Sequence, residues 1–455
     1  MRVLIISWNY PPLASVASER IWCFARYLGE AGYGVDVLTG ESAVPYKETL
    51  PGVTVHRVVS PVQQAIESRL GFLRAPTGFQ EPHSHHAVEG RNTAAGKKQS
   101  DLLWKTARAL NRFRIRRGLG YLGRMPDMTD LWCRPARRWI NAQPGWDIVI
   151  SSYAPYSCLR LGRYAQRTGK CLLWAADFRD LWTRHHLYKG LFPFTLIERT
   201  MEKNLLRHAD LVSTVSDGLA DVLRRDHDLP NIHVVCNGFR PLEEIAPLPS
   251  PLPQTGRKIL LYTGTLYPEH QDVEALFVAL AQLRKQHPVQ AGQVLLAFAG
   301  GNVDVLLPLI ESHGCEDQVT LLGLLSPDAA RTAQQHAQAL LYIGARPGAC
   351  SYGGIVPCKL FEYAASGPPV LFLGQSDASD AQFLSQTGAG KIVDNTPAEI
   401  CRALKSLADG LPQRGGPRDE SFIAGFSRRT QTQYLILVLR AAMLKFAEPA
   451  GKCKI

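Results

Sequence analysis

Short, almost wholly apolar runs recur along the chain and alternate with stretches whose apolar residues have helical spacing. In Glu19–Ala31, for example, Ile21, Phe24 and Leu28 fall on one stripe, which predicts a helix packed on a core. Runs of this kind are typical of strands buried on both faces of a parallel sheet. The sequence therefore predicts an α/β fold. The clearest runs are Arg2–Ser7, Val35–Thr39, Asp147–Ser151, Cys171–Ala176, Lys258–Thr263, Val294–Gly301 and Pro369–Leu373.

The length of the chain predicts two domains. Its 455 residues, 45% of them hydrophobic, are enough for two cores, because domains usually contain about 100–200 residues. A proline-rich run, Pro241–Pro253, has the composition of a stiff linker. We therefore expect a first domain over 1–245, with an insertion at about 60–142, a linker at 246–256, and a second domain over 257–425.

The ten cysteines are scattered, without a Cys-x-x-Cys pair or zinc-like spacing. This pattern is typical of reduced thiols in a cytoplasmic protein. We expect no signal peptide and no membrane span. The histidines His83, His85 and His86 lack cysteines or carboxylates at matching spacing, so they indicate a solvated loop, and no metal site is predicted.

The formal charge of +11 indicates an acidic partner. Between Leu102 and Pro126 there are seven basic residues and no acidic one before Asp127, and Trp104 and Phe113 interleave with them. An amphipathic basic segment over 104–124 could lie on an anionic membrane surface. It could equally be a helix that covers a domain with a solvated basic face. A nucleic-acid partner is not predicted, because no recognisable nucleic-acid module surrounds the segment.

The stretch Tyr352–Leu373 contains a Gly-rich loop followed by a helix that is expected to begin near Pro357 and to stop at Gly367. Lys359 falls in the first turn of this helix, where backbone N–H groups already attract an anion such as phosphate. Glu362 shares its face. The alternative is that Lys359 and Glu362 form a solvated ion pair.

A second group of charged residues, Asp177, Arg179 and Asp180, follows the predicted strand Cys171–Ala176. Ligands of α/β sheets bind at the carboxyl ends of strands, so these residues are candidates for a site. The carboxylates could act as general bases or bind an acceptor hydroxyl. Alternatively, Arg179 bridges both carboxylates and only holds a loop. The loop after the first strand, Asn9–Ser18, is expected at the same edge.

These motifs resemble a known enzyme family. Pro357-Cys-Lys-Leu-Phe-Glu-Tyr-Ala-Ala-Ser-Gly-Pro-Pro-Val370 is similar to the donor-site helix of retaining glycosyltransferases of family 4, and Asp177-Phe-Arg-Asp-Leu-Trp182 is similar to a signature of a subset of that family. The resemblance implies the GT-B fold. In that fold two Rossmann-like domains face each other across a cleft, and a C-terminal helix, here within 426–455, crosses back to the first domain.

The resemblance also implies roles for individual residues. Lys359, together with Asp177, would be catalytic, and Glu362 would hold the nucleotide ribose. The full donor-binding set would be Gly264, Thr265, Gly300, Arg346, Lys359 and Glu362. The acceptor-side set would be Asn9, Tyr10, Ser18, Arg20, Arg179 and Asp180. No cofactor is implied, since the nucleotide-sugar is a substrate.

On the donor side, the chain departs from the family pattern at three positions. Gly354 stands where many members have a glutamate that contacts the donor sugar, and Thr265 and His270 replace an arginine and a lysine. The expected function is transfer of a sugar from a nucleotide-sugar, such as a UDP-sugar, to a glycan or lipid-linked acceptor in cell-surface polysaccharide synthesis. The enzyme would be cytoplasmic or peripheral on the inner membrane face. The alternatives are a non-catalytic donor-binding scaffold and a sugar-nucleotide epimerase.

Overall fold

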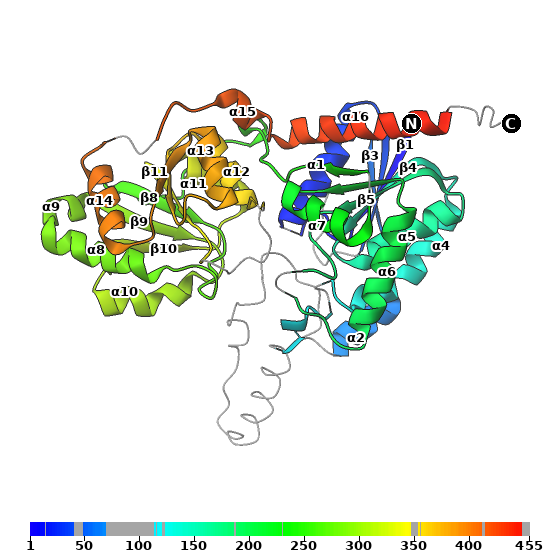
Figure 1. The fold of residues 1–455 in the computed structure, drawn as a ribbon, viewed down its shortest axis with the longest axis horizontal. Helices are drawn as coiled ribbons and strands as arrows, with labels where there is room; N and C mark the ends of the chain where they lie inside the picture. Colours follow the sequence, from blue (N-terminus) through cyan, green and yellow to red (C-terminus); the bar gives the residue numbers. More distant parts are fainter. Residues whose placement is uncertain are drawn as a thin grey trace, which may run out of the picture. The chain divides into compact units, whose positions relative to one another are not determined.

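The computed structural model describes residues 1–13, 15–40, 49–69, 113–114, 116–120, 123–185, 188–229, 231–346, 354, 356–411 and 415–447. Two compact units make up the chain. The first contains Met1–Cys236 and the chain from Thr432 onward, and the second contains Asn237–Gln431. Each is an α/β unit with its own sheet (Figure 1). Two sequence predictions fall outside the described residues: the solvated loop with His83, His85 and His86, and most of the basic segment 104–124.

The first unit is built on a seven-stranded parallel sheet with the order β3-β2-β1-β4-β5-β6-β7. Ser152 on β4 and Ser213 on β6 both stand opposite Asp177 on β5, so this register brings three polar side chains together near the carboxyl ends of the strands. The strands are β1 (Arg2–Ile6), β2 (Gly34–Thr39), β3 (Val53–Arg57), β4 (Trp146–Tyr153), β5 (Cys171–Phe178), β6 (Leu211–Thr214) and β7 (Ile232–Val234).

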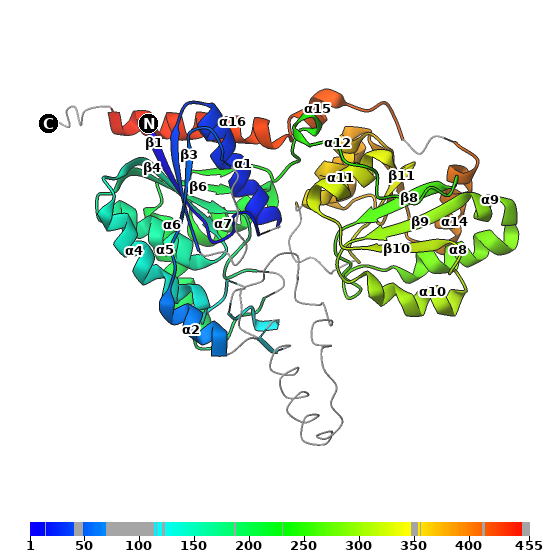
Figure 2. The ribbon, with the colours of Figure 1, turned by 180° about the vertical axis from the view of Figure 1, so that it is seen from behind.

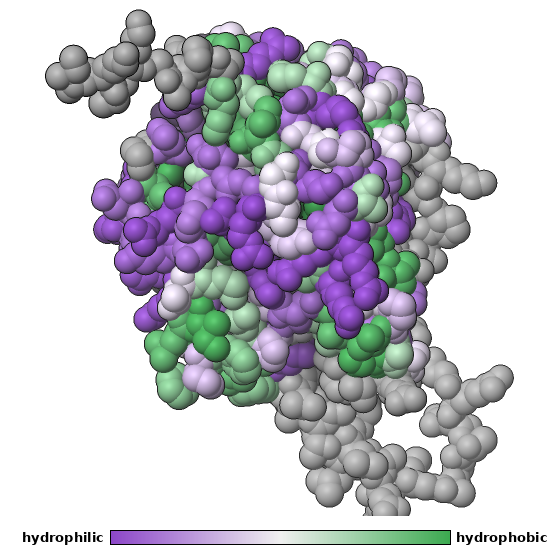
Figure 3. All heavy atoms as spheres, turned by 90° about the vertical axis from the view of Figure 1, so that its right-hand side faces the viewer, coloured by the Kyte–Doolittle hydropathy of each residue, from purple (hydrophilic) through white to green (hydrophobic). Residues whose placement is uncertain are grey.

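Helices cover the first sheet on both faces. On one face, α1 (Val16–Glu30) and the last helix, α16 (Arg428–Ala447), share a core with apolar residues of β1, β2, β4 and β5. Leu435 and Leu439 of α16 are buried in that core. The other helices of the unit are α2 (Pro61–Arg69), the 3-10 helix η2 (Met128–Trp132), α4 (Cys133–Ala142), α5 (Tyr156–Arg167), α6 (Phe194–His208) and α7 (Asp217–His227). The side that carries α4 and α5 is largely hydrophilic (Figure 3).

The second unit contains a six-stranded parallel sheet with the order β10-β9-β8-β11-β12-β13. Its strands alternate with helices, which Figure 2 shows from behind. The strands are β8 (Lys258–Thr263), β9 (Val294–Ala299), β10 (Val319–Gly323), β11 (Ala339–Ile343), β12 (Val370–Leu373) and β13 (Gly390–Val393).

The helices of the second unit lie on both faces of its sheet. Helices α8, α10 and α14 share a core with residues of β8, β9 and β11, whereas α11 and α12 pack together on the other face (Figure 2). The elements are η3 (Leu242–Glu244), α8 (Glu274–Gln286), α9 (Pro288–Gln293), η4 (Val303–Leu306), α10 (Leu307–His313), α11 (Pro327–His336), α12 (Cys358–Ser366), α13 (Ser379–Thr387), α14 (Pro397–Ala408) and α15 (Glu420–Ala424).

The predicted fold class is confirmed, because both sheets are parallel and alternate with helices. The predicted strand Cys171–Ala176 continues to Phe178, so Asp177 lies inside the strand rather than after it. Among the described helices, none combines the length and apolar character needed to cross a bilayer.

Candidate active site

The donor-side site predicted from the sequence lies at the amino end of α12. Pro357 occupies the N-cap position and provides no side-chain hydrogen bond to the first amides of the helix. Gly367, with φ of 102°, ends the helix. Lys359 stands in the first turn, where the N–H groups at a helix start favour an anion. The local sequence thus produces the arrangement that was predicted.

Lys359 is held by an aromatic residue from the neighbouring strand. Its Nζ lies 2.7 Å from the hydroxyl oxygen of Tyr262, at the end of β8. The same Nζ lies 4.2 Å from the centroid of the Tyr262 ring and 5.6 Å from that of Tyr342. An ammonium over aromatic faces keeps its charge while its position becomes fixed. The Tyr262 hydroxyl donates onward to the carbonyl of Thr265 at 2.9 Å, so it ties the loop after β8 to α12.

Two glycines bring the loops after β8 and β9 together. Gly264 has φ of 111°, and a Cβ added there would lie 3.8 Å from Lys359 Nζ. A Cβ added at Gly300 would lie 2.2 Å from the Gly264 carbonyl oxygen, closer than non-bonded atoms can approach. The residues at these positions must therefore be glycine, and they leave exposed backbone next to the Lys359 ammonium.

A buried hydroxyl network holds α12 against β8. The Tyr363 hydroxyl accepts a hydrogen bond from the Thr263 amide at 2.7 Å. Gln334 donates to the Thr263 hydroxyl at 2.9 Å, and Ser366 donates to the Gln334 side chain at 3.2 Å. Burial raises the pKa of Tyr363 to about 12, so its hydroxyl keeps its proton. These contacts fix the register of the helix that carries Lys359.

Glu362, the predicted ribose ligand, lies one turn after Lys359 on α12. Its Oε1 is 3.4 Å from Nη2 of Arg331 on α11, and Nη1 of the same guanidinium is 3.1 Å from Asp328. Glu362 keeps partial exposure, with 19% of its side chain accessible. The sequence left open an ion pair between Glu362 and Lys359. Instead, Glu362 contacts Arg331 and Lys359 contacts Tyr262.

Three further donor-side positions lie on the loops after β8 and β11. Arg346 is half exposed, and its Nη2 is 3.7 Å from Asp272. Its backbone amide donates to the carbonyl of His270 at 2.6 Å. Gly354 donates its amide to the Ser379 hydroxyl at 2.7 Å, with φ of 83°. The Thr265 carbonyl accepts the hydrogen bond from the Tyr262 hydroxyl. Arg346, on the loop after β11, is thus a candidate donor-side cation in addition to Lys359.

On the first unit, Asp177 forms a buried ion pair with Arg20. The two oxygens of Asp177 lie 2.8 Å and 3.1 Å from Nη2 and Nε of Arg20. Ser152 and Ser213 each donate to Asp177 at 2.8 Å. Arg20 also donates to the carbonyl of Cys236 at 3.1 Å. Burial would raise the pKa of Asp177, but Arg20 and the two hydroxyls outweigh it and hold the pKa below its usual value.

The sequence predicts that Asp177 follows the strand and is accessible to a ligand, and the structure differs from this prediction. Asp177 has no exposed surface, and Arg20 is nearly as buried. No local sequence pattern links the two residues, because Arg20 lies on α1 and Asp177 on β5. In one interpretation of the sequence, Arg179 bridges Asp177 and Asp180. In the structure it pairs with Asp180, with 2.9 Å between Nη1 and Oδ2. Arg179 and Asp180 keep partial exposure after β5 and form a pair separate from Arg20 and Asp177.

The remaining acceptor-side candidates lie on the loop after β1. The Asn9 side chain is partly buried and donates to the carbonyl of Ala154 at 2.8 Å. Tyr10 is buried in the core of the unit. Ser18 is buried in the first turn of α1, where its amide donates to the Ser15 hydroxyl that caps the helix. Asn9 is therefore the partly accessible member of this group, and Tyr10 and Ser18 stabilise the loop.

Arg124, the last cation of the predicted basic segment, points into the first unit and is buried. Its Nη2 lies 2.7 Å from Oε2 of Glu198, and its Nη1 donates to the carbonyl of Tyr188 at 2.8 Å. Arg124 therefore adds no positive charge to a solvent-facing surface of this segment. Glu198, on α6, is a buried carboxylate, and the Arg124 guanidinium balances its charge.

Within the described ranges, no three His, Cys, Asp or Glu side chains are arranged to hold a metal ion. The predicted histidines His83, His85 and His86 are not part of those ranges.

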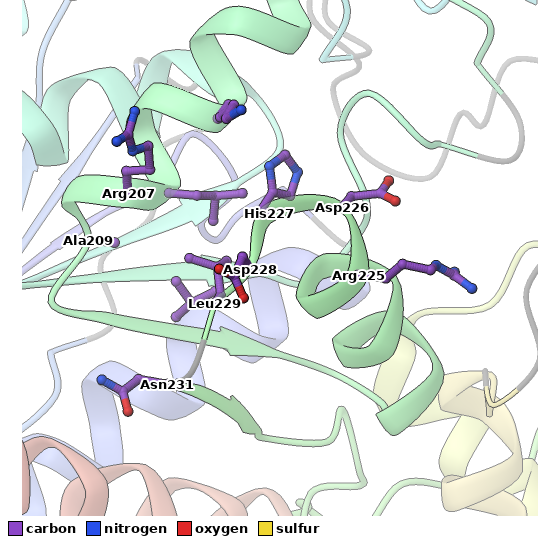
Figure 4. Close-up of a pocket in the computed structure, with 11 residues that line it drawn as sticks. Arg207, Ala209, Arg225, Asp226, His227, Asp228, Leu229 and Asn231 are labelled. Atoms are coloured by element: carbon purple, nitrogen blue, oxygen red, sulfur yellow. The ribbon is translucent and has the colours of Figure 1, made fainter.

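A cavity of about 610 Å³ opens in the first unit, away from the predicted residues (Figure 4). It lies between the carboxyl ends of α6 and α7, next to the amino ends of β6 and β7. Arg225 extends away from His227 and Leu229, so the polar groups around the cavity do not converge (Figure 4). Asp177 lies near the opposite ends of the strands.

Comparison with known proteins adds a family and a fold. A family model described as glycosyltransferase family 4 matches residues 83–241. A comparison with curated proteins found no match.

Several solved structures share the fold of the whole chain. Sucrose-phosphate synthase from Thermosynechococcus elongatus is 16% identical, with a TM-score of 0.57 over 99% of this chain and 100% of that one. The catalytic domain of starch synthase IV from Arabidopsis thaliana, bound to ADP and acarbose, is 9% identical, with a TM-score of 0.55 over 97% and 99%. An E. coli structure described as trehalose-6-phosphate bound with UDP-2-fluoro glucose is 12% identical, with a TM-score of 0.53 over 98% of both chains. The chain thus combines the GT-B fold of two Rossmann-like units with a region that matches the glycosyltransferase family 4 model.

Proposed function

We propose that the protein transfers a sugar, with retention of anomeric configuration, from a nucleotide-sugar to a hydroxyl group of a glycan or lipid-linked acceptor. A UDP-sugar is the donor that we would test first, and cell-surface polysaccharide is the product class that we infer. The family 4 match over 83–241 and the GT-B fold support a glycosyltransferase. The donor, the acceptor, the stereochemistry and a location at the cytoplasmic membrane face are part of the proposal.

The observation that carries the proposal is the position of Lys359. Its ammonium lies in the first turn of α12, 2.7 Å from the Tyr262 hydroxyl and beside the exposed backbone of Gly264. A diphosphate placed there would meet a fixed positive charge, a helix amino end and a backbone without a Cβ. Glu362, one turn further along α12, would bind the ribose hydroxyls, and Arg346 would add a second charge.

In this mechanism the bond between the anomeric carbon and the phosphate oxygen breaks, and the electron pair stays on the nucleoside diphosphate. Lys359 and the helix amino end would stabilise that negative charge, which grows in the transition state. The acceptor oxygen forms the new bond to the anomeric carbon, and its proton passes to the oxygen of the departing diphosphate. Charge stabilisation of this kind lowers the barrier because the charged groups are already in place before the reaction.

The first unit would provide the acceptor side. Asn9, Arg179 and Asp180 are partly accessible and would contact acceptor hydroxyls or phosphate. Asp177 was predicted to contact the acceptor directly. In the observed arrangement its oxygens bind Arg20 and two serine hydroxyls, so we propose that it acts by positioning the strand end that carries Arg179 and Asp180.

A non-catalytic donor-binding protein is the second candidate. It is favoured by Gly354, Thr265 and His270, which replace residues that hold the donor in many family members. A protein of this kind would bind nucleotide-sugars at Lys359 without turning them over.

Incubation of the purified protein with a panel of nucleotide-sugars, with and without acceptor glycans, separates these functions. A transferase releases nucleoside diphosphate and forms a glycosylated product in proportion to acceptor. A scaffold binds donor, as measured by calorimetry, without release. An epimerase converts one nucleotide-sugar into another without acceptor. The proposal is wrong if no donor in the panel is bound, or if the bound donor is only epimerised.

A further inference from the structure

The outer face of α6 differs in charge from its inner face. The acidic side chains of this helix, Glu198 and Glu202, are both buried. Glu198 is neutralised by Arg124, with 2.7 Å between Nη2 and Oε2, and Glu202 accepts a hydrogen bond from the Thr183 hydroxyl. All residues of α6 are described, and its solvent face contains no carboxylate.

Four exposed residues fall on one line along this solvent face. Leu196, Thr200, Lys203 and Arg207 follow each other at spacings of four, three and four residues, which places them above one another on a helix. The line spans about 16 Å, at about 1.5 Å per residue. Arg199 is exposed beside it. Arg199, Lys203 and Arg207 are exposed and form no ion pair with another described residue. Lys203 and Arg207 also line the cavity of Figure 4, whose other wall carries Asp226 and Asp228.

Large apolar side chains lie at the amino end of the same helix. Phe192, just before α6, is 74% exposed, and Leu196 and Ile197 are 55% and 50% exposed. Single exposed apolar residues are common on protein surfaces, but a contiguous group marks an interaction site. Exposure of three such residues within one helical turn and its preceding loop is therefore typical of an interaction site.

The described part of the basic segment continues this surface. The amide of Gly190 donates to the carbonyl of Arg117 at 3.1 Å, and Arg117 Nη1 donates back to the carbonyl of Gly190 at 3.2 Å. Lys189 and Arg116, next to these residues, are both exposed, and Phe113 is 44% exposed. More cations and another aromatic ring thus adjoin the chain that leads into α6.

We propose that this surface, which we call the α6 face and define as Phe192, Leu196, Ile197, Arg199, Lys203 and Arg207, lies against an anionic lipid bilayer. The aromatic and aliphatic side chains enter the interface between headgroups and acyl chains, and the cations bind headgroup phosphates. Charge complementarity selects this occupant over an uncharged partner. A nucleic acid would satisfy the cations but would leave the apolar residues in water.

The inference rests on the membrane-face location in the proposed function and names the surface that would provide it, but it can be tested without sugar transfer. Binding of the full-length protein to vesicles requires neither donor nor acceptor, so its failure would leave the proposed transferase activity untouched. Co-sedimentation is measured with vesicles of phosphatidylcholine alone and of phosphatidylcholine mixed with phosphatidylglycerol. We expect binding to the anionic vesicles, and we expect it to weaken as salt screens the charges.

The variants separate the two parts of the surface. Arg199→Gln with Lys203→Gln should lower the partition coefficient on anionic vesicles about 25-fold, because each cation near such a surface contributes about fivefold. Phe192→Gln should lower it about tenfold. The matched controls lie on the second unit: Lys285→Gln with Arg402→Gln removes the same charge, and Val289→Gln removes an apolar side chain that is 69% exposed. All the substituted side chains are exposed, so folding should be unaffected.

Equal binding to neutral and anionic vesicles would overturn the proposal. So would control variants that lose as much affinity as the α6 variants. If the α6 variants bind vesicles normally but change the mass of the protein in sedimentation, the surface is a contact between copies of this chain, and the proposal is wrong.

Discussion

Arg20 on α1 and Asp177 on β5 form a buried two-pronged ion pair, with 2.8 Å between Nη2 and Oδ1 and 3.1 Å between Nε and Oδ2. The residues are 157 positions apart. Two serines, Ser152 and Ser213, complete the hydrogen bonding of the carboxylate. The pair therefore joins the first helix to the centre of the first sheet, at the strand ends where the residues proposed to contact the acceptor lie.

Substitution of Asp177 by Asn should destabilise the protein, because the buried Arg20 charge would lose its partner. We expect the free energy of unfolding to fall by about 3–5 kcal/mol in urea titration. The double variant Arg20→Met with Asp177→Leu should recover part of that loss, since no charge stays buried. A double variant as unstable as the single one would show that the hydrogen bonds of Ser152 and Ser213, rather than the charge pair, hold this site.

The same pair predicts a dependence on pH. The folded-state pKa of Asp177 is lowered, and its unfolded value is about 3.9. The stabilisation is therefore complete above about pH 4 and is lost as the pH falls through the folded-state pKa. The wild-type protein should lose stability in this acidic range. The Arg20→Met, Asp177→Leu variant should lose less over the same range, which urea titrations at a series of acidic pH values would measure.

Glu202 predicts a second dependence on pH, with the opposite sign. Burial raises its pKa to about 7, against hydrogen bonds from Thr183 that lower it. A carboxyl group with a raised pKa stabilises the fold below its unfolded pKa, near pH 4, and this contribution is lost as the pH rises through about 7. Glu202→Gln should make the free energy of unfolding less dependent on pH between about 5 and 8. An unchanged slope would mean that Glu202 stays ionised in the folded protein.

Substitutions at the amino end of α12 test the donor site. Lys359→Met should weaken UDP binding about 100-fold in calorimetry, since it removes the charge that faces the diphosphate. Tyr262→Phe keeps the ring but removes the hydroxyl 2.7 Å from Nζ, and we expect a loss of about tenfold. Lys391→Met, an exposed change on β13 of the same unit, is the control for charge. A Lys359→Met protein that binds UDP normally would contradict the proposed site.

The two central glycines of the donor side give a test of stability. Gly300→Ala would place a Cβ 2.2 Å from the Gly264 carbonyl oxygen, so the loops after β8 and β9 would have to separate. We expect the free energy of unfolding to fall by about 3 kcal/mol or more. Gly292→Ala, on α9, meets nothing within 4 Å and should be neutral or should stabilise by up to about 1 kcal/mol. Thermal unfolding of both variants is the measurement.

Much of the fold could be predicted from the sequence, because the signal for a parallel strand is local. The run at Lys258–Thr263 has the predicted bounds, and α12 begins one residue after Pro357 and ends just before Gly367. Because Pro357 and Gly367 mark the two ends of the helix in the sequence, Lys359 could be placed in its first turn.

Contacts between distant segments could not be predicted in this way. In the sequence, Tyr262 is one apolar residue of a predicted strand. The pairing of β8 with β11 and the position of α12 next to β8 bring it to Lys359. Arg124 belongs to a run of cations, and its burial depends on Glu198, which is 74 residues away. Arg20 and Asp177 were both candidates, but their partnership depends on how α1 crosses the sheet.

Leu435, Ile436 and Leu439 of α16 complete a core whose first residues are Val3 and Ile5 of β1. During synthesis, these two parts of one core leave the ribosome far apart in time, because the whole second unit lies between them in the chain. The second unit, Asn237–Gln431, is continuous in sequence and can close while the first still waits for its last helix. Until α16 arrives, the nascent first unit presents an open apolar face over β1 and α1, where chaperones would find a binding surface.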